Sequence, residues 1–334
     1  MPDTYPLGKL PPDDLAALLA RWPVTDPRVI LGPKPGEDAA VIDIGAAHYL
    51  VAKTDPITFT TDELGWYAVH VNANDIAATG GTPQWFMATL LLPGGSADRA
   101  MVDAIYGQVQ AACASLGISV IGGHTEITYG IDRPIMSGTM FGLVEKTKLV
   151  RTGGAQPGDV LLLTKGYPIE AAAIIARERR EQLSGRFPAE FLSRCANYLH
   201  EPGISVVEDA RIAMEAGRVH AMHDPTEGGV ATGLWEMADA SGRRLIVDVA
   251  GAVLPDAARL CEAVSIDPAG AIASGALLLA VHPGDAGAIA AALEAGGIAA
   301  HVVGRVEEGP AAVVTQDGQP LERPARDEIA RLFE

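Results

Sequence analysis

The chain has few cysteines, few basic residues and no long hydrophobic run. Its three cysteines, Cys113, Cys195 and Cys261, are far apart and form no CxxC pair, so reduced, buried thiols are expected rather than disulfides or a metal site. No apolar run approaches the roughly 20 residues that a membrane-spanning helix needs. Lys and Arg total 25 against 42 Asp and Glu, and the net charge of −17 disfavours nucleic-acid binding. The first residues, MPDTYPLGKLPPDD, lack the basic and apolar regions of a secretory signal, which predicts a cytoplasmic location.

The length of 334 residues exceeds what one hydrophobic core usually supports, so two domains are expected. The stretch VRTGGAQPGDVLLLTKG indicates the boundary, which gives domains 1–154 and 155–334. In the first domain the patterns predict strands at 39–44, 49–55, 86–92, 118–123 and 134–146, and helices at 12–22, 65–79 and 97–116. In the second they predict helices at 169–183, 188–199, 203–216, 229–241, 284–295 and 322–334, and strands at 161–164, 245–249, 276–281 and 300–304. This order indicates an α+β or α/β fold.

The stretch VNANDIAATGG, residues 71–81, is predicted to lie on an amphipathic helix with an unusual polar face. At 100° per residue one stripe is apolar, while Asn72, Asp75 and Thr79 line a separate face. A face that only meets solvent would usually carry Lys or Glu, and Asn and Asp are poor helix formers. This face therefore either meets a polar ligand or partner or has a structural role.

Two further aspartates of the first domain stand where the chain turns. Asp38, in GEDAAVID, lies beside a glycine just before a predicted strand, where it is either a turn residue or a ligand. Asp55, in AKTDPIT, shares one strand face with Lys53 and directly precedes a proline. A strand-end cap and a ligand are both compatible with Asp55.

Two glycine pairs are candidate phosphate-binding turns. In IGGHTEIT the strand is predicted to end at Gly122 and Gly123, whose N–H groups can turn toward an anion. The next three residues, His124, Thr125 and Glu126, offer donors and an acceptor, although a histidine at a strand end is also compatible with a structural role. In HDPTEGG, Asp224 is followed by Gly228 and Gly229 at the predicted start of a helix, where free N–H groups could bind a phosphate.

If Asp38, Asp55, Asp75 and Asp224 converge, their like charges need compensation. Mg²⁺ is the usual solution, because it prefers oxygen ligands and is held by a few carboxylates together with substrate phosphates. Zinc is disfavoured, since these segments lack cysteine and no HExxH occurs. The chain also has no GxxxxGK[ST] motif and no dinucleotide-type GxGxxG, so ATP would have to be held by the carboxylates and the metal.

In this order, the motifs resemble those of the aminoimidazole ribonucleotide synthetase (PurM-like) superfamily, which includes the hydrogenase-maturation protein HypE, thiamine-monophosphate kinase and selenophosphate synthetase. The segments that carry the resemblance are GEDAAV, KTDPIT, VNANDIAATGGTP, IGGHTE, PGDVLLLTKG and HDPTEGG, and they span almost the whole chain. HDPTEGG is similar to the DPTxGG of HypE. The closest similarity is to HypE-like proteins.

The resemblance implies an N-terminal domain whose sheet forms a barrel across a homodimer, an α/β C-terminal domain, and ATP with Mg²⁺ bound in the cleft between them. By position, the metal ligands would be Asp38, Asp55, Asp75 and Asp224. ATP-binding positions would be Lys53, Thr54, Asn74, Gly122, Gly123, Thr125, Glu126, Gly228 and Gly229. His124 would contact phosphate or substrate and is the candidate general base.

The resemblance also has departures. Glu37 stands where the family has the first aspartate of GDD, and the sequence ends Leu332-Phe333-Glu334, without the terminal cysteine of HypE. Carbamoyl dehydration on such a cysteine is therefore not expected. The predicted function is Mg²⁺-dependent phosphoryl transfer from ATP to an oxygen of a small-molecule or protein-borne substrate. The alternatives are a thiamine-monophosphate kinase-like enzyme and a non-catalytic nucleotide-binding protein that acts with a maturation-type partner.

Overall fold

The computed structural model describes residues 10, 12–21, 24–34, 36–45, 47–58 and 62–333. The outer limits of the two predicted domains, residues 1 and 334, lie outside these ranges. The chain divides into two compact units. The N-terminal unit consists of Asp26–Gly32 and Asp38–Leu149, and the C-terminal unit of Met1–Thr25, Pro33–Glu37 and Val150–Glu334. The structure thus groups two early segments with the C-terminal unit, whereas the boundary expected from the sequence is a single cut after residue 154.

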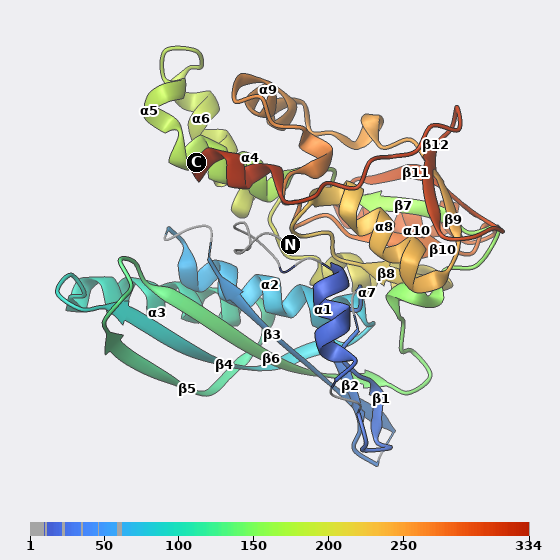
Figure 1. Cartoon of the computed structure of the whole chain (residues 1–334), viewed down its shortest axis with the longest axis horizontal. Coiled ribbons are helices and arrows are strands. Elements are labelled where there is room, and N and C mark those ends of the chain that lie inside the picture. Colours follow the sequence, from blue (N-terminus) through green and yellow to red (C-terminus); the bar gives the residue numbers. More distant parts are fainter. Residues whose placement is uncertain are drawn as a thin grey trace. The chain divides into compact units, whose positions relative to one another are not determined.

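A six-stranded mixed sheet forms the frame of the N-terminal unit. Its strand order is β1 (Val29–Leu31), β2 (Ala40–Asp43), β3 (His48–Ile57), β6 (Ile135–Glu145), β4 (Thr82–Pro93) and β5 (Ser119–Thr128). Only β4 and β5 pair in parallel, and the other neighbours are antiparallel. Helices α2 (Leu64–Ala78) and α3 (Arg99–Leu116) pack together on this sheet (Figure 1). The described strands form an open sheet, so a single chain has no closed barrel.

Helix α2 is almost entirely buried, because small residues let it approach the sheet. Every residue from Tyr67 to Ala78 is buried, including the polar positions on its face. On β6, a Cβ atom at Gly138 would lie 2.6 Å from the Asn72 amide nitrogen and 3.0 Å from the Ala68 carbonyl oxygen. The helix ends where Gly80 takes a left-handed φ of 76°. The glycine pair of VNANDIAATGG therefore stops the helix.

Substitution of Gly138 by alanine is expected to destabilise the N-terminal unit by about 1 to 3 kcal/mol, because the added methyl group overpacks the contact between α2 and β6. Urea denaturation followed by circular dichroism measures the change. The matched control is Gly107→Ala in the middle of α3, where an added Cβ has no neighbour within 4 Å. That change is expected to raise stability slightly, since alanine favours a helix. Equal effects of the two substitutions would contradict the packing argument.

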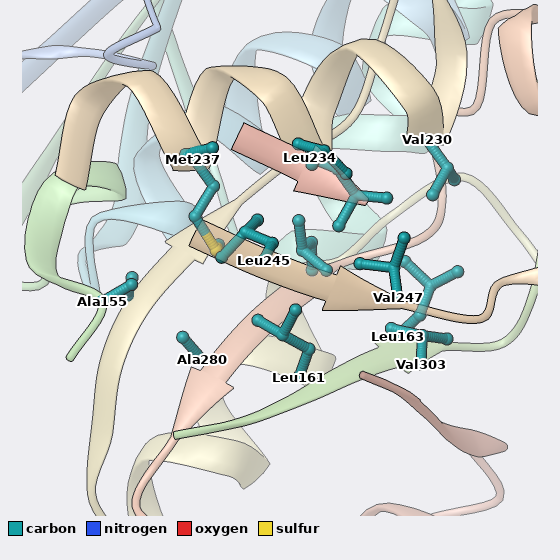
Figure 2. Packing of buried hydrophobic residues seen from close by; sticks show 14 of the residues in the cluster. Ala155, Leu161, Leu163, Val230, Leu234, Met237, Leu245, Val247, Ala280 and Val303 are labelled. Carbon is teal, nitrogen blue, oxygen red and sulfur yellow. The ribbon is translucent and has the colours of Figure 1, made fainter. Parts of the chain in front are cut away.

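The C-terminal unit contains a second six-stranded mixed sheet. Its order is β12 (Ala312–Thr315), β9 (Arg244–Val247), β11 (Ala300–Glu307), β7 (Val160–Thr164), β10 (Leu278–Val281) and β8 (Val219–His223). Strand β7 is an apolar run, as expected for a strand covered on both faces. Leu161 and Leu163 belong to the cluster under helix α8 (Gly229–Ser241), shown in Figure 2, and α10 (Ala286–Ala295) also packs on β7.

Several other helical segments contribute to a second hydrophobic cluster. They are α4 (Ile169–Glu178), α5 (Arg180–Leu183), α6 (Ala189–Ala196), α9 (Pro255–Ala263) and the 3-10 turn η5 (Glu328–Phe333). Helix α7 (Val207–Ala216) packs against α10, and α1 spans Pro12–Leu19. In the described residues, no helix combines the length and apolar character that a bilayer crossing needs.

Most predicted elements are present with changed ends. The predicted helix 169–183 is two helices, 203–216 begins only at Val207, and the predicted helix 322–334 is reduced to η5. Residue 22 of the first predicted helix and residue 334 of the last lie outside the described ranges. The predicted strand 118–123 continues to Thr128, so its glycine pair lies inside a strand. Helix α9 and strands β1 and β12 are additional elements.

Candidate active site

A lysine held between two aspartates is the central feature of the N-terminal unit. The Lys53 ammonium nitrogen lies 3.1 Å from Oδ2 of Asp55 and 3.3 Å from Oδ2 of Asp75. The Asp75 side chain is 6% exposed and the Lys53 side chain 20% exposed. The structure therefore brings together three of the predicted site residues, two candidate metal ligands and one candidate nucleotide-binding residue.

Two elements fix this arrangement. Because strand side chains alternate, Lys53 and Asp55 project from the same face of β3. Asn72 of α2 clamps the strand: its Oδ1 accepts from the Asp55 backbone N–H at 2.8 Å, and its amide donates to the Asp55 carbonyl oxygen at 3.3 Å. Asp75 follows Asn72 by three residues and so lies on the same side of the helix. Asn72 on the polar helix face thus has a structural role, and Asp75 on the same face belongs to the charged cluster.

Electrostatics keep Lys53 protonated. Burial alone would lower the pKa of the ammonium group, but the negative charges of Asp75, Asp55 and Asp38 outweigh it and raise this pKa above its usual range. Asp38 thus acts on the same lysine from the segment just before β2. The negative charges of three aspartates thus act on one ammonium group.

Two predicted nucleotide-binding residues next to this cluster have other surroundings. Thr54 alternates to the opposite face of β3, where its hydroxyl donates to the Gly138 carbonyl oxygen at 2.7 Å and accepts from Thr139 at 3.2 Å. Asn74 is fully buried within α2. The structure therefore does not place the Thr54 side chain with Lys53 and Asp55.

The predicted phosphate-binding turn lies on the edge strand β5. Gly122 and Gly123 pair with Met87 and Ala88 of β4, and a Cβ at Gly123 would come within 2.3 Å of the Ala88 carbonyl oxygen. This close approach explains the need for glycine at 123. On the exposed surface of the strand, Nε2 of His124 lies 3.3 Å from Oε2 of Glu126. The Thr125 hydroxyl is hydrogen-bonded to Tyr106 of α3.

Register places this turn away from the lysine cluster within one chain. Asp55 is opposite Gly138, Gly138 is opposite Ala88, and Ala88 is opposite Gly123. Asp55 and Gly123 are thus in one row, three strand spacings or roughly 14 Å apart along the sheet. A single metal ion cannot contact both positions in the same chain.

In the C-terminal unit, the predicted glycine turn is already capped. Gly228 and Gly229 both take left-handed φ values at the start of α8. The Gly228 N–H donates to Oδ2 of Asp327 at 2.6 Å, and the Gly229 N–H donates to the Thr226 carbonyl oxygen at 3.0 Å. A carboxylate of the chain itself thus occupies the helix end at which the sequence predicts a phosphate.

Several acids gather around this turn. Burial raises the pKa of Glu170, in the first turn of α4, to about 8, and the charges of Glu227, Asp327 and Asp224 add to the effect while Ser274 opposes it. Burial also raises the pKa of Asp327 to about 6. Among the residues that the structure describes, Oε2 of Glu170 has no hydrogen-bond partner, and Glu170 is 5% exposed. Glu170 is therefore held in its neutral form near pH 7.

Sequence reasoning missed Glu170 and Asp327. The signal for Glu170 is a single acid inside the apolar run PIEAAAIIA, which is unexpected on a buried helix unless the acid has a role. Asp327 has no such signal, because its partner Gly228 is 99 residues away in the sequence.

The donor set of the lysine cluster fits Mg²⁺ in one specific way. Within the described ranges, no three or more His, Cys, Asp or Glu side chains are arranged to hold a metal ion by themselves. Mg²⁺, however, is usually bound through one or two carboxylates together with substrate phosphates. Asp55 and Asp75 offer carboxylate oxygens of this kind. Asp224 belongs to the C-terminal unit and is 2% exposed.

Comparison with protein families gives two consecutive matches. Residues 36–144 match the model described as AIR synthase related protein, N-terminal domain. Residues 156–317 match the AIR synthase related protein, C-terminal domain. The first match ends at residue 144 and the second begins at residue 156.

Curated relatives include two kinds of protein. The chain is 29% identical over 294 residues to carbamoyl dehydratase HypE of Cupriavidus necator, covering 86% of this chain and 79% of the relative. It is 31% identical over 265 residues to selenide, water dikinase of Dechloromonas aromatica, covering 76% of this chain and 71% of the relative.

Solved structures share the fold at low sequence identity. HypE in complex with ATP has a TM-score of 0.71 and 22% identity, with 92% of each chain covered. AaThiL complexed with AMPPCP and TMP has a TM-score of 0.73 and 20% identity, covering 97% of this chain and 99% of that one. The molecule therefore has a two-domain PurM-like α/β fold with two mixed sheets.

Proposed function

Because this chain belongs to the AIR synthase related protein family, we propose that it is an ATP-using enzyme that works with Mg²⁺. The reaction we propose is phosphoryl transfer from ATP to an oxygen of a small-molecule or protein-borne substrate. The observation that carries the proposal is the pair of carboxylates, Asp55 and Asp75, that two different elements hold at one lysine.

The chemistry of this cluster suits phosphoryl transfer. Bound Mg²⁺ would neutralise charge on the phosphates, and positioning supplies most of the remaining catalysis in this reaction class. Asp38, Asp55 and Asp75 would bind the ion, and Lys53 would contact a phosphate oxygen as a point charge. We further propose Asp224 as a ligand, and Asn74, Gly122, Gly123 and Thr125 as nucleotide contacts. We propose Thr54, Glu126, Gly228 and Gly229 as further nucleotide contacts; in this structure the Thr54 hydroxyl and the two glycine N–H groups are hydrogen-bonded within the chain.

The names of three relatives support the proposal that this chain uses ATP. One solved relative is HypE in complex with ATP, another is AaThiL with AMPPCP and TMP, and a curated relative is a selenide, water dikinase. For this chain, His124 remains the candidate base. Glu170, whose carboxyl group is held neutral near pH 7, is a candidate proton donor.

Calorimetry with ATP, with and without Mg²⁺, tests the binding half of this proposal. We expect ATP to bind tightly only when Mg²⁺ is present. ADP release is then measured with thiamine monophosphate, with selenide and with a metabolite pool. Mg²⁺-dependent binding with no ADP or phosphate from any of these would support the non-catalytic alternative. Absence of ATP binding under all conditions would end the proposal.

A maturation-type partner is the second part of the proposal. One solved structure of similar fold is a HypE–HypF complex, with a TM-score of 0.71 and 21% identity. If this chain acts on a protein-borne substrate, a partner of that kind would deliver it. Copurification with a tagged chain, followed by the ADP assay with the isolated partner, tests this part.

We also propose that the chain forms a homodimer through β5. This long edge strand is exposed from Ser119 to Ile127, and Val120, Ile121 and Ile127 are 52%, 55% and 65% exposed. Tyr129, just beyond it, is 94% exposed. A long apolar edge is a liability unless another chain covers it. A second copy of the open sheet would cover it and could complete a barrel across the two chains.

Ile127→Lys is expected to weaken this dimer by at least about tenfold, because a charge on an edge strand opposes pairing. Light scattering coupled to gel filtration, over a range of concentrations, measures the mass. Val302→Lys is the control, since Val302 is an apolar residue on β11 of the C-terminal unit with 68% exposure. A wild-type chain that is monomeric at every concentration would contradict the proposed dimer.

A further inference from the structure

Lys53 forms ion pairs with two aspartates. Its ammonium group therefore lies where a metal ion would otherwise be expected. Its nitrogen is 3.1 Å from Asp55 and 3.3 Å from Asp75, so both carboxylates use Oδ2 to contact the same cation. Asp75 is nearly inaccessible, with 4% of its surface exposed. The ammonium group thus bridges the two carboxylates.

The backbone fixes this position. Lys53 is two residues before Asp55 on β3, and Asn72 ties the Asp55 backbone to α2 through two hydrogen bonds. Asn72 also donates to the Ala68 carbonyl oxygen at 2.9 Å, which holds its own side chain in place. The lysine is therefore part of a rigid contact between a strand and a helix.

We propose that Lys53 is a built-in cation of this site, which takes one of the positions that a divalent ion would take if residue 53 were neutral. The proposal rests on the proposed function, because it concerns the same carboxylates. The consequence is that the site selects a nucleotide that already carries its metal ion. With Lys53 in place, the cluster has little affinity for a free divalent ion, and a metal ion binds only together with the phosphates that accompany it.

The arrangement also explains why no described group of acidic side chains forms a metal cage. Two carboxylates share the lysine, so fewer oxygens are left for an ion by itself. When an anionic ligand enters, the ammonium can contact an anion oxygen and release a carboxylate for the metal. Lys53 is in this sense a positioning residue for the carboxylates as well as a phosphate contact.

The test uses the full chain without nucleotide. Lys53→Met keeps the length of the side chain and removes its charge, whereas Lys53→Arg keeps the charge. In EDTA, Lys53→Met is expected to melt at a lower temperature than wild type, and Mg²⁺ or Mn²⁺ alone is expected to restore the loss. The melting temperatures of wild type and Lys53→Arg should barely respond to these ions. Mn²⁺ titration followed by electron paramagnetic resonance should show at least about tenfold tighter binding to Lys53→Met than to wild type.

Lys146→Met is the matched control. Lys146 pairs with Asp43 at 2.7 Å in the same unit, but both side chains are about 30% exposed. Its loss should leave the response to Mn²⁺ unchanged. If Lys53→Met does not fold in EDTA, the protein is purified in Mg²⁺ and the chelator is added afterwards. Unfolding on chelation that Mn²⁺ reverses then supports the proposal.

Two results would overturn the inference. One is that wild type binds free Mn²⁺ as tightly as Lys53→Met does. The other is that divalent ions fail to restore the stability of Lys53→Met. Both are independent of ATP, so they can be told apart from failure of the proposed function, which appears as the absence of Mg²⁺-dependent ATP binding to the wild-type chain.

Discussion

Asp75→Asn is expected to weaken binding of ATP with Mg²⁺ by about 10- to 100-fold, which corresponds to the roughly 1.5 to 3 kcal/mol of a charge-assisted contact. The substitution keeps the shape of the side chain and removes one of the two carboxylates at Lys53. The remaining positive charge of Lys53 would then be compensated less and would repel a metal ion more strongly. Calorimetry with ATP, with and without Mg²⁺, measures the loss.

Asp43→Asn is the control for this experiment. Asp43 pairs with Lys146 on the surface of the same unit and is not one of the proposed ligands, so its loss should leave ATP binding unchanged. If the aspartates merely end turns and strands, Asp75→Asn will bind ATP and Mg²⁺ as wild type does. That outcome would exclude the assignment of Asp75 as a ligand.

Glu170→Gln is expected to stabilise the protein at pH 8 relative to wild type, by up to about 4 kcal/mol. Burial raises the pKa of Glu170 to about 8 from its ordinary 4.5, and the charges of Glu227, Asp327 and Asp224 contribute. A raised pKa in the folded state means that this group costs no stability below pH 4.5. Between pH 4.5 and 8 the Glu170 carboxyl group ionises freely only in the unfolded chain. The cost to the free energy of unfolding therefore grows by roughly 1.4 kcal/mol for each pH unit in this range.

The measurement is urea unfolding of wild type and Glu170→Gln at a series of pH values from 4 to 9. The difference in unfolding free energy should be small near pH 4 and should increase up to about pH 8. Glu190→Gln is the matched control, since Glu190 also lies in the first turn of a helix but is exposed. A difference between wild type and Glu170→Gln that stays constant with pH would show that Glu170 ionises normally. Asp327, whose pKa is raised to about 6, should add a similar pH dependence to the unfolding free energy of both proteins at lower pH.

The neutral Glu170 also bears on function. A buried acid that is protonated near pH 7 can donate a proton or, after a small change in its surroundings, accept one. If Glu170 takes part in the proposed reaction, Glu170→Gln will lose turnover while it gains stability. A stabilised variant with unchanged turnover would leave His124 as the candidate base.

Much of the fold can be predicted from local patterns. The helix predicted at 65–79 is α2, Leu64–Ala78, and the strand predicted at 49–55 lies within β3. Periodicity identifies such elements because each side chain position depends only on residues a few places away. Ends were less predictable: α7 begins at Val207, four residues after the predicted start, and the terminal helix is only a short turn.

The site was predicted less completely than the fold. The aspartates at 55 and 75 and the lysine at 53 were all candidates, and the structure places them together. Thr54 was a candidate too, but strand alternation turns its side chain to the other face. Gly228 was a candidate phosphate contact, but Asp327 caps its N–H from 99 residues away. Motifs identify positions, whereas the direction of each side chain depends on its packing partners.

The sequence by itself determined the family, the order of the elements and the kinds of side chain available, because motif spacing and hydrophobic period are properties of short segments. Only the tertiary structure decided that Asn72 holds β3 to α2, that Lys53 lies between Asp55 and Asp75, and that Glu170 is buried among other acids. These features arise from contacts between residues far apart in the chain. Burial and charge at a residue depend on all its neighbours in space, and a linear pattern does not contain them.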